Sequence, residues 1–206
     1  MSYPVAQDPA ACEILARWRD LYRAEIGVHL HPWSTPPFAD LPHPEPVPAA
    51  QLPQPLLRDK FERLVKQVQD SLGVAPQSFR MGRFDFSPAI QDLLPAMGLK
   101  VDSSIVPLTL KGTGDYFLAP ADPFWLGPAL LEVPVTMVPV IAGSPRALSR
   151  LAARLPGAAG RGLLDRFRCV AAAGIQPAWF PLASMRLAAS LHRRRHGQVL
   201  TMFFHS

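Results

Sequence analysis

The stretch of sequence that decides the fold is LRDKFERLVKQVQDSLGVAPQSFRM, residues 57–81. Its apolar side chains recur at three- and four-residue spacing up to Gly73, which predicts an amphipathic helix that ends on a glycine. Pro76 prevents the helix from resuming, and Ser78 to Met81 has the composition of a strand. A helix followed at once by a strand is typical of an α/β domain. The apolar positions of the helix are Leu57, Phe61, Leu64, Val65, Val68 and Leu72.

Helices and strands continue to alternate on both sides of this stretch. On the N-terminal side, Asp8 and Pro9 predict a helix start, and residues 25–31 alternate in polarity as a strand does. The pattern predicts a single α/β domain over residues 1–206, layered or barrel-shaped, with a mostly parallel sheet. On the C-terminal side, helices are expected from 87, from 144, over 163–173 and over 184–194, and strands over 99–101, 130–138, 175–180 and 199–204.

Composition excludes several classes of protein. With 206 residues, 49% of them apolar and 18% charged, the chain has the composition of one soluble globular domain and not of a disordered segment. No apolar run reaches the roughly 18 residues of a membrane-spanning helix. Nine of the 24 prolines lie in residues 32–55, which predicts a long loop of the kind that often carries function. Cys12 and Cys169 are single, so we expect buried, reduced thiols and a cytoplasmic location.

Charge is distributed unevenly along the chain. Residues 144–206 hold ten arginines, no lysine and one acidic residue, a net charge of +9, whereas the preceding residues carry −4. A basic end can bind nucleic acid or an anionic membrane surface, but arginines on outward helix faces explain the same pattern. Because no aromatic platform accompanies Arg193, Arg194 and Arg195, we expect no nucleic-acid partner.

Four groups of polar residues lie where predicted strands end. They are the pair His29 and His31, Arg80, Asp102 and His205. In parallel α/β folds the functional groups collect at these positions, where strands pass into loops. His29 and His31 are two residues apart on one strand, so their side chains share a face.

Five segments of the chain resemble a known family. In order they resemble the successive motifs of the polysaccharide deacetylases of the NodB homology type, carbohydrate esterase family 4. The resemblance implies a deformed (β/α) barrel, and the HPW and FRMGR forms are similar to members associated with bacterial surface-polysaccharide gene clusters. The segments are EIGVHLHPW (25–33), SFRMGRFDFSP (78–88), VDSSIVP (101–107), LLEVPVT (130–136) and FFHS (203–206).

The resemblance also implies an activity, namely metal-dependent hydrolysis of N-acetyl groups on a bacterial surface polysaccharide or its precursor. A divalent ion, by this resemblance zinc, would bind His29. The second histidine of the family stands four residues after the first, where this chain has Trp33, and His31 is the substitute on the same strand face.

The remaining motif residues take their roles from the same resemblance. Arg80 matches the arginine that orients the catalytic carboxylate, Asp102 the aspartate that tunes the acid histidine, and His205 the histidine that protonates the leaving amine. Three aromatic residues, Trp33, Phe84 and Trp125, could stack on sugar rings, although aromatic residues near proline-rich loops more often serve in packing.

One family motif is absent. Members begin with a strand ending in Thr-Phe-Asp-Asp or a similar motif, which carries the general base and the third metal ligand, and this chain has no such motif. We therefore expect a barrel without its first strands, with an open sheet edge beside residues 25–31 through which a homodimer could form. The alternative is a non-catalytic carbohydrate-binding or assembly protein on the same scaffold.

Overall fold

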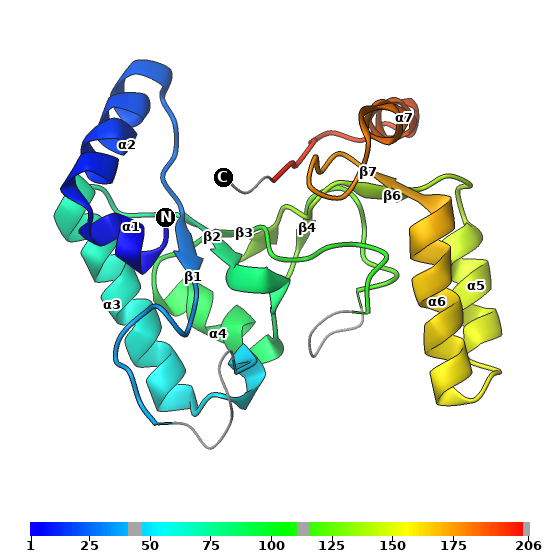
Figure 1. The fold of residues 1–206 in the computed structure, drawn as a ribbon, viewed down its shortest axis with the longest axis horizontal. Coiled ribbons are helices and arrows are strands. Elements are labelled where there is room, and N and C mark those ends of the chain that lie inside the picture. Colours follow the sequence, from blue (N-terminus) through cyan, green and yellow to red (C-terminus); the bar gives the residue numbers. More distant parts are fainter. Residues whose placement is uncertain (41–46, 111–115, 204–206) are drawn as a thin grey trace. The chain divides into compact units, whose positions relative to one another are not determined.

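The computed structural model describes residues 1–40, 47–110 and 116–203 (Figure 1). The chain forms two compact units. The N-terminal unit comprises residues 1–104 and 125–131, and the C-terminal unit comprises residues 105–124 and 132–206.

Two helices open the N-terminal unit. α1 spans Tyr3–Gln7 and α2 spans Pro9–Tyr22; only α2 is predicted from the sequence. The Asp8 carboxylate accepts a hydrogen bond of 3.0 Å from the backbone N–H of Ala10, and Pro9 begins the helix. The start of α2 is as predicted because Asp8 satisfies a donor that the first helical turn leaves open.

α3, Gln54–Leu72, is the helix predicted from the decisive stretch. All six residues of its apolar stripe are buried. Gly73 follows the helix in the left-handed region, with φ 65°, and its N–H donates to the carbonyl of Gln69 at 2.8 Å. The predicted helix and its glycine end are therefore confirmed.

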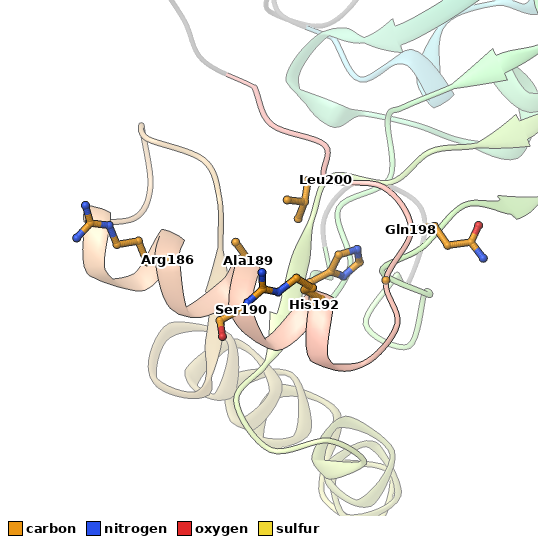
Figure 2. A pocket seen from close by; sticks show the side chains of 8 residues that line it. Arg186, Ala189, Ser190, His192, Gln198 and Leu200 are labelled. Carbon is orange, nitrogen blue, oxygen red and sulfur yellow. The ribbon is translucent and has the colours of Figure 1, made fainter.

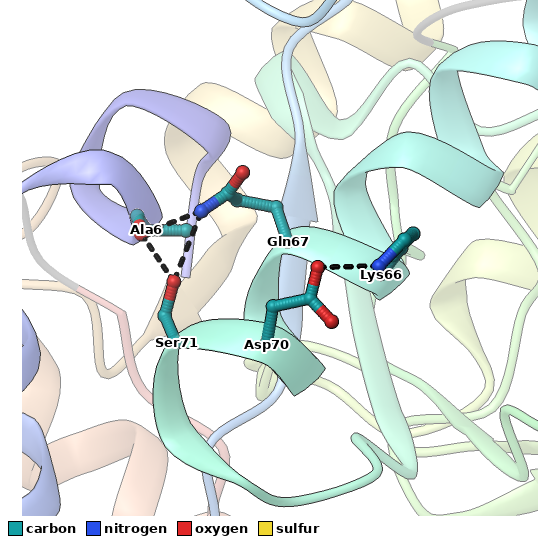
Figure 3. A network of polar contacts seen from close by, with 5 residues as sticks. All are labelled: Ala6, Lys66, Gln67, Asp70 and Ser71. Carbon is teal, nitrogen blue, oxygen red and sulfur yellow. Dashed lines mark hydrogen bonds and ion pairs between the residues drawn. The ribbon is translucent and has the colours of Figure 1, made fainter.

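A small polar network joins α3 to α1 (Figure 3). The carbonyl of Ala6 accepts hydrogen bonds from Gln67 Nε2 at 3.2 Å and from Ser71 Oγ at 2.7 Å. On the same stretch of α3, Lys66 and Asp70 form an exposed ion pair of 2.5 Å, one helical turn apart. The hydrogen bonds fix the two helices together, whereas an exposed pair of this kind contributes little to stability.

Five short strands form the main sheet. β1–β2 and β2–β3 pair in parallel, so the predicted α/β architecture with a parallel sheet is confirmed. In this register His29 lies opposite Arg80, and Phe79 lies opposite Asp102. The strand order across the sheet is β1 (Val28–Leu30), β2 (Ser78–Met81), β3 (Val101–Asp102), β5 (Leu131–Glu132) and β4 (Phe124–Trp125).

The two faces of this sheet differ in burial. On the face toward α3, the ring of Phe79 lies 5.1 Å from that of Phe61. Because strand side chains alternate between faces, His29 and Arg80 lie on the opposite face, where they are half-buried. The fully covered face carries Val28, Leu30, Phe79 and Met81.

β1 lies at one edge of the main sheet. On its outer side, the backbone N–H of His29 donates a 2.9 Å hydrogen bond to the carbonyl of Met1. The homodimer through this edge stays a prediction.

One more helix and two short 3-10 turns complete the N-terminal unit. The turns are η1, Ala49–Gln51, and η2, Gly82–Phe84, and the helix is α4, Pro88–Ala96. α4 follows Ser87 and Pro88 as predicted. Its buried residues are Ile90, Leu93 and Leu94.

The C-terminal unit is a helical hairpin and a further helix around a two-stranded sheet (Figure 1). β6, Met137–Pro139, pairs antiparallel with β7, Ala172–Gly174. The hairpin of α5, Ser144–Ala152, and α6, Gly157–Ala171, connects the two strands. α7, Leu182–Arg194, packs on β7 and β6. One apolar cluster of this unit contains Val138, Ala173, Ile175 and Ala188, and another contains Phe117, Ala152 and Leu164.

The strand predicted over residues 130–138 is two strands, β5 and β6. Pro134 lies between them, and a proline has no N–H with which to continue a ladder of hydrogen bonds. The predicted single strand over this segment is therefore wrong in its continuity.

The strands predicted over 175–180 and 199–204 are wrong within the described residues. In the first segment the carbonyl of Gln176 accepts hydrogen bonds from the N–H groups of Trp179 and Phe180, both at 3.0 Å, which makes a turn. In the second, Thr201 contacts Thr136 through both its N–H and its carbonyl, but no strand forms over residues 199–203.

A deformed barrel and two buried cysteines are also predicted from the sequence. The described strands form two separate sheets and no closed barrel, so the deformed barrel is not confirmed. Cys12 is buried as expected, but the expectation is wrong for Cys169, which is exposed on α6 together with the adjacent Val170. No helix within the described ranges combines the length and apolarity needed to cross a membrane.

Candidate active site

His29 and His31 come together at the carboxyl end of β1. Their imidazole rings meet edge to face, with centroids 4.4 Å apart and planes at 86°. His29 Nδ1 lies 2.7 Å from the backbone carbonyl of Arg80 on the neighbouring strand. A carbonyl only accepts hydrogen bonds, so Nδ1 carries the proton and the lone pair of His29 is on Nε2.

The His29 imidazole is held in its neutral form. Burial, together with the neighbouring His31, lowers the pKa of His29 from 6.5 to about 4. A neutral imidazole with its proton on Nδ1 is the form that binds a metal ion through Nε2.

This depressed pKa has a consequence for stability. Between pH 6.5 and about 4 the unfolded chain binds a proton at His29 that the folded chain does not, so stability rises with pH in this window and is constant above it. We expect metal-free protein to lose about 2 kcal/mol of unfolding free energy from about pH 6.5 to about pH 5. Urea unfolding at several pH values measures this loss.

The variant His29→Gln removes the titrating group and should lose this part of the pH dependence. The variant His196→Gln, which changes an exposed histidine in the C-terminal unit, should retain it. An equal acid loss in wild type and His29→Gln would show that another group is responsible.

Arg80 lies beside His29 on β2 and is held in place by Ser103. Its Nε donates to the Ser103 carbonyl at 2.9 Å, and an Nη donates to Ser103 Oγ at 2.6 Å. The guanidinium carbon also lies 6.0 Å from the centre of the Phe84 ring. Two hydrogen bonds and an aromatic face therefore hold this guanidinium in one orientation, as recognition of a carboxylate requires.

The tight turn after β2 brings a second arginine to the site. Arg83 and Phe84 have left-handed backbone conformations, with φ 58° and 57°, which are uncommon for residues with a side chain. This turn places the Arg83 guanidinium 4.8 Å from the centre of the Trp33 ring, and the same ring lies 4.5 Å from His31.

Gly82 makes room for His31 at the start of this turn. A Cβ atom on Gly82 would lie 2.2 Å from His31 Nδ1 and 2.6 Å from the carbonyl oxygen of Leu30. Both distances are shorter than any ordinary contact, so this position tolerates only glycine without a shift of β1 or of the His31 ring. The glycine of the FRMGR segment therefore shapes the histidine pair.

Lys60 fixes the loop that follows the histidines. This lysine on α3 is only 3% exposed, and its Nζ donates to the carbonyls of Pro32, Thr35 and Pro37 at 2.7–2.8 Å. Its ammonium group donates three hydrogen bonds to backbone oxygens. Because the prolines of this region have no N–H group, few backbone donors are present there to satisfy these oxygens. The beginning of the proline-rich loop, including Trp33, is thus anchored to the core.

The structure does not bring every predicted site residue to the histidines. Asp102 is fully buried, and the register places it beside Phe79 on the face that α3 covers, opposite His29 and Arg80. Its Oδ1 accepts a 2.5 Å hydrogen bond from Ser104 Oγ, which in turn accepts from the N–H of Met81 at 2.8 Å. In this position Asp102 ties β3 to β2.

Two more predicted residues lie elsewhere. Trp125 is 66% exposed on β4, the strand at the opposite edge of the sheet from β1. His205 lies outside the described residues, so its role as the acid stays a prediction. Phe84 is buried beneath Arg80, which fits the packing alternative for this aromatic residue.

Sequence reasoning missed Lys60 and Ser103. Lys60 had a visible signal, because it stands three residues after Leu57 and four before Leu64, within the apolar stripe of α3. Ser103 had none, since its contact with Arg80 depends on the pairing of β2 with β3.

The side chains around the histidine pair can be compared with the ligand set of a metal centre. A catalytic zinc site has three protein ligands and an open position. His29 fits, because a carbonyl orients its Nδ1–H and leaves Nε2 available, and His31 lies against it. Across residues 1–40, 47–110 and 116–203 no group of three or more His, Cys, Asp or Glu side chains could hold a metal ion. Among the described residues, two side chains therefore fit the role of metal ligands, and none provides the third ligand.

Comparisons with known proteins add little to this picture. No family model matches the sequence, and no curated protein matches it. Among solved structures the chain is similar to a proposed polysaccharide deacetylase from Mycobacterium smegmatis, with 15% identity and a TM-score of 0.46 over 99% of this chain and 73% of that one. We therefore base the functional interpretation on the side chains described above.

Proposed function

We propose that this protein is a hydrolase that removes N-acetyl groups from a bacterial surface polysaccharide or its precursor, with a divalent ion, preferably zinc. The observation that carries this proposal is the pair of neighbouring imidazoles, one of them held neutral with its Nε2 lone pair available. The order of the motifs along the sequence supports the same activity.

In this proposal His29 and His31 hold the ion. When bound, such an ion polarises the acetyl carbonyl and so makes the amide carbon easier to attack. Arg80, fixed on Ser103, binds and orients a carboxylate or the developing negative charge beside the histidines. Trp33 lies beside His31 and borders the space next to the pair, and His205 supplies the proton to the leaving amine.

The second candidate function is carbohydrate binding without hydrolysis on the same scaffold. It is favoured by one observation, namely that among the described residues no carboxylate completes a metal site with the two histidines. In both functions the protein binds the same carbohydrate, and the functions differ in whether an acetyl group is released.

Acetate release tests the proposal. The full chain, with zinc, is incubated with oligomers of N-acetylglucosamine, and acetate and free amine are measured together. We expect equal amounts of both, loss of release with a chelator, and a rate about 100-fold lower in Arg80→Met. Arg161→Met, which changes an exposed arginine on α6, is the matched control and should keep the rate. Binding of the oligomer without acetate release would establish the second function instead.

A further inference from the structure

A pocket of about 550 Å³ lies along α7 in the C-terminal unit (Figure 2). One wall is α7 itself, and the other is the segment that follows it, with Gln198 and Leu200. It is separate from the histidine pair, which belongs to the N-terminal unit. Its lining residues are Arg186, Ala189, Ser190, His192, Arg193, Gly197, Gln198 and Leu200.

A buried histidine joins the two walls of the pocket. His192 is 4% exposed, and its Nε2 donates to the carbonyl of Val199 at 2.9 Å and lies 3.3 Å from Asp122 Oδ1. The same Asp122 oxygen accepts a 2.8 Å hydrogen bond from the N–H of Gln198. A Cβ atom on Gly197 would lie 2.2 Å from His192 Nε2, so the chain packs directly on the imidazole. The second wall is therefore fixed against α7.

Among the described residues that line the pocket, two are positively charged arginines and none carries a carboxylate. Arg186 and Arg193 are both exposed, and within the part of the chain that the structure describes neither forms an ion pair with an acid. Arg193 stands seven positions after Arg186 on the helix, about 10 Å along the axis. A single small anion cannot bridge that distance, whereas a chain with repeated negative charges can.

The chemistry of the lining favours a glycan over a nucleic acid. Proteins that bind single-stranded nucleic acids combine basic residues with aromatic side chains on which bases stack. The lining residues that the structure describes include no Phe, Tyr or Trp, whereas Ser190 and Gln198 offer hydroxyl and amide groups that pair with sugar hydroxyls.

We propose that the pocket along α7 binds a stretch of acidic polysaccharide, with one anionic group of the polymer at Arg186 and another at Arg193. This inference names the substrate class of the proposed function and rests on it. The strongly basic composition of residues 144–206 draws the same polymer to this unit.

Binding of a uronic acid tetramer, measured by calorimetry in chelator at about 50 mM and about 300 mM salt, tests the proposal. We expect the tetramer to bind to the wild type. The double variant Arg186→Gln with Arg193→Gln should lower the affinity for the tetramer by about tenfold. The matched control, Arg161→Gln with Arg166→Gln, removes two exposed arginines of α6 and should change the affinity by less than about twofold.

Three results would overturn the proposal. The first is an equal loss of affinity in the control, which would mean general charge attraction. The second is an equal affinity for a neutral N-acetylglucosamine tetramer or for inorganic phosphate. The third is tighter binding of a single-stranded DNA of similar charge. Because this assay contains no metal and measures no acetate, the uronate can bind while acetate release fails. In that case the pocket assignment stands and the deacetylase proposal fails.

Discussion

The substitution His29→Ala is expected to weaken the proposed zinc binding by about 100-fold, because it removes one of the two proposed imidazole ligands and leaves His31 alone. The physical basis is the neutral state of His29, whose Nδ1–H is committed to the Arg80 carbonyl at 2.7 Å while Nε2 remains for the ion. Titration of the chain with zinc against a competing chelating dye measures the affinity. Circular dichroism verifies that the variant keeps its fold.

His196→Ala is the control for this experiment, since it removes an exposed histidine from the C-terminal unit. It should bind zinc as the wild type does. A second variant, His31→Ala, should weaken binding to a similar extent as His29→Ala. If wild type and His29→Ala bind zinc equally, the pair is not a metal site, and the carbohydrate-binding alternative gains.

The substitution Lys60→Met is expected to lower the free energy of unfolding by on the order of 4 kcal/mol. It leaves three buried carbonyls, those of Pro32, Thr35 and Pro37, without the donor that now satisfies them. The new side chain has a similar shape but cannot donate a hydrogen bond. Urea unfolding followed by tryptophan fluorescence measures the loss.

Lys66→Met on the same helix is the matched control. Lys66 is 72% exposed, and its ion pair with Asp70 lies in solvent, so the change should cost less than about 0.5 kcal/mol. Similar losses in the two variants would mean that the hydrogen bonds of Lys60 do not anchor the loop. A large loss with Lys60→Met alone would show that residues 32–37 are held by one buried ammonium group.

The helices were largely predictable because their signals are local. Asp8 with Pro9, Gly73 and Ser87 with Pro88 act within one or two turns of the helix that they begin or end. The buried stripe of α3 follows in the same way from spacing alone. Only α1 gave no signal, because its five residues are too few to show the helical repeat of apolar positions.

The strands were less predictable because a strand needs a partner. Residues 130–138 have strand composition, yet Pro134 divides them and only β5 and β6 find neighbours. Residues 175–180 are apolar enough for a strand, but the carbonyl of Gln176 closes a turn instead. Composition alone cannot state which segment finds a pairing partner.

The sequence by itself determined the neighbours along each element: the shared face of His29 and His31 follows from the two-residue period of a strand, and the stripe of α3 follows from the helical period. Only the tertiary structure decided what lies across the elements. Parallel register placed Arg80 beside His29 and Asp102 on the opposite face, and folding buried Lys60 against carbonyls some 25 residues away. Contacts of this kind depend on which strands pair and which side chains lose water, and neither is encoded in the spacing of residues along one segment.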